Sequence, residues 1–203
     1  MMGHTLSAAL YLVALINPIS KVFLLSMLAD KEETAAIREA SIRASVVALA
    51  LLLILAAVGN SIFTLVFHVE LHSLRVAGGI VLFAIGYQAL TRGVFFETTD
   101  ADKLAEISLV PLASPMIAGP ATITAAISFP PAHGLGPTAL AILIAVIVNL
   151  VIMLFSRHIG AVLMRFNLMG ALIRITGLIV ATIAAEMVLS GLGEWYASLA
   201  SAA

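Results

Sequence analysis

The chain has 203 residues, of which 62% are hydrophobic and only 10% are charged, and its formal net charge is −1. A soluble domain is about 45–50% apolar and about 25% charged, so this composition indicates a polytopic membrane protein. The near-neutral charge gives no reason to expect a nucleic-acid partner, and the absence of cysteine excludes disulfides and thiolate chemistry.

Six segments are long and apolar enough to be transmembrane helices, each of which needs roughly 20 apolar residues. The predicted spans are about Thr5–Leu28, Ala44–Phe67, Leu74–Thr91, Ile107–Phe129, Pro137–Ser156 and Leu172–Leu192. The loops between them are short, which predicts a single transmembrane domain over residues 1–203 in a lipid bilayer. The two longest connections, about Ala29–Arg43 and Arg92–Glu106, carry both charge signs and are expected to hold short surface helices.

The basic residues are distributed unequally between the two membrane faces. All Lys and Arg residues except Arg75 fall on the face that carries the loops after the first, third and fifth spans. The positive-inside rule makes this face cytoplasmic. We therefore expect a multi-pass protein of the plasma (inner) membrane with both termini outside.

Prolines interrupt the first and the fourth span. Asn17-Pro18 lies in the first and Gly119-Pro120 in the fourth. Proline lacks an N–H and clashes with the carbonyl four residues back, and it pushes the preceding residue out of the helical region. A helix broken at mid-depth presents carbonyls to a cation at one new end and N–H groups to an anion at the other. The pair suits a small zwitterion such as an amino acid. The alternative is that the prolines only kink the helices.

An internal repeat relates the two halves of the chain. Residues 75–81 and 174–180 resemble each other, each with an Arg followed by a Gly three positions later, and the two proline breaks fall at nearly the same offset. The repeats are about residues 1–95 and about residues 104–203. Each half has three spans, an odd number, so the halves lie in opposite orientation. The predicted fold is an all-α membrane protein of six transmembrane helices in two inverted-topology repeats, with spans 1 and 4 discontinuous.

The candidate site residues follow from the two breaks and from polar groups at membrane depth. Asn17 offers both a donor and an acceptor, the hydroxyls lie beside the breaks, and the two glycines of spans 3 and 6 leave space there or serve helix packing. The predicted substrate-binding residues are Asn17, Pro18, Ser20, Ser114, Gly119, Pro120, Thr122, Thr124, Gly78 and Gly177. The candidates for ion coupling are Glu186, Lys21 and Asn149, because ionisable or amide groups inside a span are functional hypotheses.

Other classes of function find less support. An intramembrane enzyme needs a nucleophile with a base, or a ligated metal, at membrane depth. No His lies mid-span, Glu186 is alone, and His68 and His72 flank Glu70 only in a short loop, so we expect no catalytic role, cofactor or metal. An exporter of lipophilic or antimicrobial molecules remains the alternative to an amino acid transporter, although it predicts a wide aromatic cavity and only 6% of the residues are aromatic.

At these residues the chain resembles the MarC family of integral membrane proteins, which includes the SnatA small neutral amino acid transporters. The resemblance rests on Asn17-Pro18-Ile19, on the proline-rich run 111–120, and on the two Arg–Gly motifs. It implies six spans, an inverted repeat and proton-coupled transport of glycine, alanine and similar substrates. The chain departs from the family pattern at Ser20 and Lys21, where relatives carry an acidic or amide residue, and at Glu186, where Gln is expected. Alternating access would rock one repeat against the other, and a homo-oligomer is left open.

Overall fold

The computed structural model describes residues 2–28, 34–95 and 117–202, with the side chains of 5–26, 34–95 and 117–200. Every regular element in these ranges is helical, which confirms the all-α class for them. The helices are α1 (Met2–Ile16), α2 (Pro18–Leu28), α3 (Thr34–Ser61), the π-helix η1 (Ile62–Val66), α4 (Leu71–Arg92), α6 (Pro120–His133), α7 (Leu135–Leu154), α8 (Ser156–Arg165) and α9 (Met169–Ala202).

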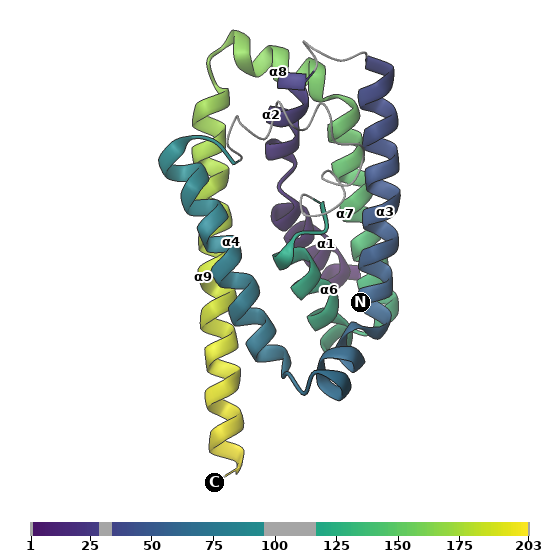
Figure 1. Ribbon diagram of the computed structural model, residues 1–203, viewed down its shortest axis with the longest axis vertical. Coiled ribbons are helices and arrows are strands. Elements are labelled where there is room, and N and C mark those ends of the chain that lie inside the picture. Colours follow the sequence, from purple (N-terminus) through teal and green to yellow (C-terminus); the bar gives the residue numbers. More distant parts are fainter. Residues whose placement is uncertain (1, 29–33, 96–116, 203) are drawn as a thin grey trace.

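Among the described residues, five segments are long and apolar enough to cross a membrane. They are Thr5–Ser26, Thr34–Val66, Leu71–Arg92, Leu135–Leu154 and Met169–Ala200. The predicted fourth span, about Ile107–Phe129, lies partly outside the described residues, and α6 contains its second half. The chain alternates in direction: α1 and α2 ascend in Figure 1, α3 descends, α4 ascends, α6 descends, α7 ascends and α9 descends.

Two helices are longer than the apolar runs that predicted them. α3 begins at Thr34 rather than near Ala44. The prediction of a separate surface helix is therefore wrong from residue 34 onward, because these residues form the first part of α3. Its sequence is helix-forming, and Arg43 pairs with Glu39 one turn earlier, a favourable spacing on an exposed helix face. α9 likewise continues beyond Leu192. Hydropathy marks the part of a helix suited to hydrocarbon, whereas the backbone hydrogen bonds extend as far as helix-forming residues allow.

α4 and α9 form a close antiparallel pair because glycines let their backbones meet. A Cβ added to Gly86 would lie 2.7 Å from the backbone nitrogen of Ala181, and one added to Gly79 would lie 2.8 Å from the carbonyl oxygen of Ala184. Gly177 faces Ala89 of α4 in the same way, at 2.8 Å. Small residues at such spacing allow helices to approach closely in membranes, where van der Waals packing drives association. Figure 1 shows the pair side by side along most of its length.

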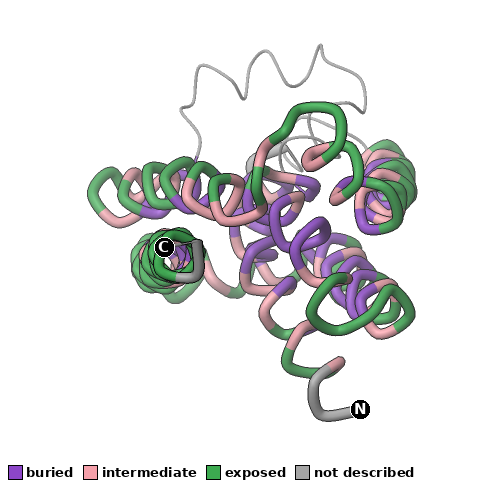
Figure 2. The backbone as a smooth tube through the Cα atoms, turned by 90° about the horizontal axis from the view of Figure 1, so that it is seen from below, coloured by how far each residue is buried: buried purple, intermediate pink, exposed green. Residues whose placement is uncertain are grey.

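The remaining long helices pack into a core of mostly small and branched side chains. α1 and α3 both contact α7, and α3 also contacts α6. Leu12, Ala48, Ala126 and Ala145 are each almost completely buried in this cluster. Figure 2 shows the buried residues concentrated at the centre, whereas the C-terminal helix α9 is exposed on most of its surface. Most of the described buried hydrophobic residues therefore lie on α1, α3, α6 and α7.

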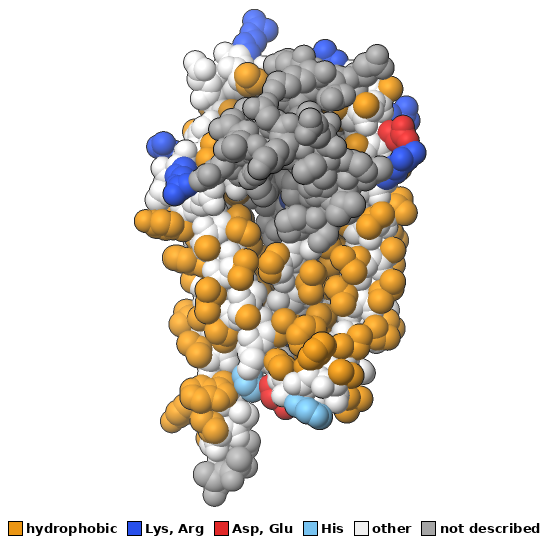
Figure 3. All heavy atoms as spheres, in the orientation of Figure 1, with side chains coloured by type: hydrophobic (Ala, Val, Ile, Leu, Met, Phe, Trp, Pro, Cys, Tyr) orange, Lys and Arg blue, Asp and Glu red, His pale blue; other side chains and the backbone are white. Residues whose placement is uncertain are grey.

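The outer surface has the distribution of a membrane protein. Apolar side chains such as Val47, Ile54, Ile147 and Ile179 are exposed, and hydrophobic atoms cover much of the face drawn in Figure 3. An apolar surface of this extent on a soluble monomer would be an aggregation hazard, but in a bilayer it meets lipid. The described arginines other than Arg75 lie at the start of α3, the end of α4, on α8 and near the start of α9, all at one end of the bundle.

Candidate functional site

The first helix break lies at Asn17, between α1 and α2. Asn17 has φ +53°, in the left-handed region that asparagine tolerates better than other non-glycine residues. Its backbone N–H donates to the carbonyl oxygen of Val13 at 3.0 Å, which closes α1 in a left-handed capping turn. Pro18 then begins α2, where its missing N–H is not required. The prediction that Asn17-Pro18 breaks the span is therefore confirmed in the local geometry.

The second break lies at Gly119, before α6. Gly119 has extended backbone geometry (φ −76°, ψ 171°), and Pro120 is the first residue of the helix. The carbonyl oxygen of Gly119 accepts a hydrogen bond from the Ile123 N–H at 2.9 Å, the first bond of the helix. The N–H groups of Ala121 and Thr122 have no backbone acceptor among the described residues. They are the free donors that a helix N-terminus presents.

One cavity joins the two breaks. It has a volume of about 300 Å³ and is lined by parts of α1, α2, α4, α6 and α9. Its lining includes the break residues and their polar neighbours Asn17, Ser20, Lys21, Gly119, Pro120 and Thr122. The rest of the described lining is mostly apolar, with Val81, Leu82, Ile85, Phe95 and Val180. Segments about a hundred residues apart in the sequence thus meet at one place, which we call the central cavity.

Two buried polar side chains of the central cavity have no partner among the described residues. Asn17 is 8% exposed and Thr122 is 2% exposed. The amide of Asn17 and the hydroxyl of Thr122 make no side-chain hydrogen bond to another described residue. The fully enclosed side-chain atoms without a partner in the described structure are those of Ser45, Ser128 and Asn149, whereas Asn17 and Thr122 line the cavity. A ligand or water in the cavity can therefore satisfy both groups.

Lys21 occupies the C-terminal end of the broken helix α1. The residue is buried, and its Nζ donates a hydrogen bond to the carbonyl oxygen of Ile16, the last residue of α1. The Ser20 hydroxyl donates to the carbonyl oxygen of Asn17 at 2.7 Å. The freed carbonyls at a helix C-terminus attract a cation, and one of them is satisfied by a side chain of this chain. The sequence pointed to Lys21 as a coupling candidate but did not predict this hydrogen bond.

Other predicted residues lie outside the central cavity. Pro18 is buried but does not line it. Gly177 packs against α4, and Gly78 leaves room for the Thr124 side chain, since a Cβ there would collide with its hydroxyl. Ser114 lies outside the described residues. Asn149 is fully buried on α7; its amide nitrogen donates to the Met153 sulfur at 3.1 Å and its Oδ1 has no described partner.

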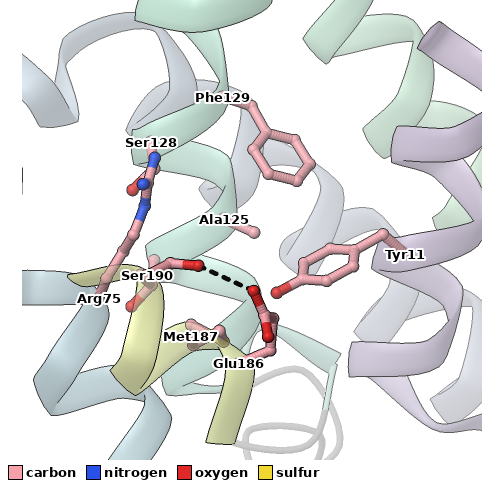
Figure 4. A pocket seen from close by; sticks show the side chains of 9 residues that line it. Tyr11, Arg75, Ala125, Ser128, Phe129, Glu186, Met187 and Ser190 are labelled. Carbon is pink, nitrogen blue, oxygen red and sulfur yellow. Dashed lines mark hydrogen bonds between the residues drawn. The ribbon is translucent and has the colours of Figure 1, made fainter. Parts of the chain in front are cut away.

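Glu186 and Thr124 line a second pocket, nearer the end of the bundle that holds the N-terminus of α4. This outer pocket has a volume of about 220 Å³. Glu186 is exposed rather than enclosed by protein, and its Oε1 accepts a hydrogen bond from Ser190 at 3.2 Å (Figure 4). Tyr11 and Arg75 line the same pocket. Neither was among the predicted site residues: Tyr11 belongs to no motif, and Arg75 was noted only as the one basic residue of its membrane face and as the start of a repeat motif.

The loop histidines form no metal-binding group. Within residues 2–28, 34–95 and 117–202, no set of three or more His, Cys, Asp or Glu side chains is placed to hold a metal ion. His68 and His72 lie on either side of the start of α4, beside Glu70. The polar groups that line the central cavity are amide, hydroxyl, amine and backbone groups.

Comparison with known proteins identifies a family of membrane proteins. The chain is 36% identical to UPF0056 membrane protein PH0214 of Pyrococcus horikoshii, over 95% of both chains. It is 32% identical to UPF0056 membrane protein YvbG of Bacillus subtilis, over 94% of both. No solved structure matches it at a significant level. Residues 2–196 match the description of a MarC family integral membrane protein. This protein is an integral, multi-pass membrane protein that belongs to the MarC family.

Proposed function

We propose that the protein is a secondary transporter of small neutral amino acids of the glycine and alanine class, with the central cavity as its substrate site. The observation that carries the proposal is the cavity at the two helix breaks, with Asn17 and Thr122 buried in its wall and without a side-chain partner among the described residues. Paired helix breaks with a polar site between them are the usual binding arrangement of transporters built from inverted repeats.

The polar groups of the cavity fall into two sets that match the two charges of a zwitterion. The free N–H groups of Ala121 and Thr122, at the N-terminus of α6, and the amine of Lys21 suit a carboxylate. The carbonyl oxygen of Leu15, without a backbone donor among the described residues, and the Asn17 amide oxygen suit an ammonium group. The carbonyl oxygen of Ile16 already accepts a hydrogen bond from Lys21. The acceptors left for the ammonium group of a substrate are therefore the Leu15 carbonyl oxygen and the Asn17 amide oxygen.

The size of the cavity fits a small substrate. Ligand pockets range over about 300–1,000 Å³, and this one lies at the lower limit. Valine, leucine and isoleucine side chains bound the space left for a substrate side chain, and among its described residues Phe95 is the sole aromatic one. A small aliphatic amino acid suits this lining better than the large lipophilic molecules of the alternative exporter function.

The packing of the helices supports two inverted three-span repeats. In the proposed six-span arrangement, span 1 is equivalent to span 4, span 2 to span 5 and span 3 to span 6. α1 contacts α6, α3 contacts α7 and α4 contacts α9, so each helix touches its proposed equivalent. Figure 1 shows the members of each pair running in opposite directions. A two-fold axis in the membrane plane would produce these contacts.

The same contacts favour a particular division into moving parts. Each repeat contributes one helix to the tight α4–α9 pair and two helices to the group of α1, α3, α6 and α7. We therefore propose that α4 and α9 move together against the core, rather than that one repeat rocks against the other as a unit. The central cavity lies between these two bodies, so this movement would open it to either side. Glu186 and Lys21 remain our candidates for proton coupling.

Uptake into proteoliposomes tests the proposed function. We expect radiolabelled glycine and alanine to accumulate when a pH gradient is imposed, and a Thr122→Val variant to lose most of this uptake, because it removes the hydroxyl at nearly constant volume. Thr182→Val is the matched control, since the exposed Thr182 hydroxyl bonds only its own helix, at Leu178. Absence of uptake of both amino acids under every gradient would refute the proposed function.

A further inference from the structure

The outer pocket is lined by the same four helices as the central cavity, at positions further along each helix. α1, α4, α6 and α9 all contribute to both. On α4, Arg75 of the outer pocket lies six residues from Val81 of the central cavity, and on α9 Glu186 lies six residues from Val180. At 1.5 Å per residue, these positions are separated by about 9 Å along each helix axis. The two spaces are therefore successive stages along one set of helices.

The outer pocket presents a cation and an anion to the same small volume, and an unpartnered hydroxyl is buried in its wall. Arg75 and Glu186 supply the two charges, and Figure 4 shows the Tyr11 hydroxyl pointing toward the Glu186 carboxylate. Ser128 is 3% exposed, and its Oγ has no hydrogen-bond partner in the described structure. Phe129 and Met187 give the pocket an apolar part. Two opposite charges in one small pocket suit a zwitterionic ligand, and a few polar groups in a partly apolar lining are typical of a ligand site. The buried Ser128 hydroxyl without a described partner also calls for an explanation, such as a bound ligand.

Arg75 retains donors for a ligand although it is already paired. It bonds through one terminal nitrogen to Glu194 of α9, whose side chain is about half exposed. A guanidinium group has five N–H donors, so a carboxylate can bind the remaining ones. Glu186 accepts one hydrogen bond, from Ser190, and a carboxylate has room for several. Both charged groups can therefore bind a ligand without losing their present partners.

We propose that the outer pocket is a second binding site for zwitterionic amino acids, at which Arg75 holds the carboxylate and Glu186 the ammonium group before the substrate enters the central cavity. This inference rests on the proposed transport function for its role, but the binding itself is a separate claim. The Thr124 side chain, fitted against Gly78, stands at the boundary: it lines the outer pocket, and its hydroxyl bonds Pro120 of the central cavity at 2.9 Å.

The cysteine-free sequence provides a binding assay that does not depend on transport. A Ser190→Cys variant places one thiol in the outer pocket, where a membrane-impermeant maleimide would label it. We expect glycine or alanine to slow this labelling, and neither glycerol nor a matched concentration of sodium chloride to do so. Ser198→Cys, further along α9 and exposed, is the matched control, and its labelling should not respond to any of these solutes.

Charge removal in the Ser190→Cys background tests the assignment of the two groups. Arg75→Gln and Glu186→Gln should each raise the half-protecting concentration of glycine by about tenfold or more, because each removes a charge-assisted hydrogen bond. Thermal unfolding in detergent at the same temperature as the Ser190→Cys parent shows that each variant is folded; the labelling rate itself is expected to change, because each substitution removes a charge near the thiol. Glycine methyl ester keeps only the ammonium group, so loss of its protection in Glu186→Gln would assign the ammonium group to Glu186. N-acetylglycine keeps only the carboxylate, so loss of its protection in Arg75→Gln would assign the carboxylate to Arg75.

The outcomes separate this proposal from the proposed function. Protection without uptake in proteoliposomes would leave the outer site established and refute transport. Uptake without protection would refute the outer site and leave the central cavity as the substrate site. Unchanged protection in both Arg75→Gln and Glu186→Gln would also refute the proposed binding mode.

Discussion

Replacement of Asn17 separates its backbone role from its side-chain role. With φ +53°, residue 17 is in a conformation that costs an alanine about 1–2 kcal/mol and a glycine almost nothing. Asn17→Gly therefore keeps the helix break and removes only the amide, whereas Asn17→Ala removes the amide and strains the turn. We expect the alanine variant alone to lose about 1 kcal/mol of stability through this strain.

The expected effect on transport comes from the lost contact with substrate. A hydrogen bond to a charged group contributes about 1.5–3 kcal/mol, which corresponds to about a 10- to 150-fold change in affinity. Both Asn17→Gly and Asn17→Ala should thus lower glycine uptake at low substrate concentration by about this factor. The assay is initial uptake rate against glycine concentration in proteoliposomes, with thermal unfolding in detergent measured in parallel.

Asn167 supplies the matched control for this comparison. It also has a positive φ, of 52°, but it is exposed, in the turn between α8 and α9, and it does not line the central cavity. Asn167→Gly and Asn167→Ala should reproduce the difference in stability and leave uptake unchanged. If Asn17→Gly transports glycine with unchanged kinetics, or if the Asn167 variants lose as much uptake, the assignment of the Asn17 amide to the substrate site is wrong.

Three further substitutions test other parts of the structure. Lys21→Met leaves the buried Ile16 carbonyl without its donor. The free energy of unfolding in detergent should fall by about 1–3 kcal/mol, and glycine uptake should fall as well. A variant as stable and active as the parent would contradict the capping role. Gly86→Leu forces α4 and α9 apart, because a Cβ at residue 86 would lie 2.7 Å from the backbone nitrogen of Ala181, and it should destabilise the protein by about 1–3 kcal/mol or more. Gly170→Ala should be neutral by the same thermal assay, because a Cβ there would have no atom within 4 Å. Asn149→Leu removes a buried Oδ1 without a described partner and should preserve or raise the unfolding temperature without changing uptake; a large loss of uptake would instead place Asn149 in the transport mechanism.

Part of the candidate site could be predicted because proline acts locally. Pro18 and Pro120 remove specific hydrogen bonds wherever they stand, so the breaks at Asn17 and Gly119 follow from the order of residues alone. Thr122 was also predicted as a site residue, since it lies in the first turn after a predicted break. Gly177 was predicted as a site residue with helix packing as the alternative, and the structure places it against α4; a glycine in a membrane helix serves packing or a cavity, and only the partner helix decides which.

The sequence by itself determined the membrane class and the helical content, because both follow from the composition and pattern of apolar residues. It also determined the positions of the helix breaks, because proline affects only the backbone of nearby residues. The tertiary structure alone decided that both breaks open into one cavity, that Lys21 bonds the end of α1, and that Arg75 and Glu186 line one outer pocket. These relations join residues from different helices. They depend on which helix faces meet, and that is settled by packing over the whole bundle rather than by any local pattern.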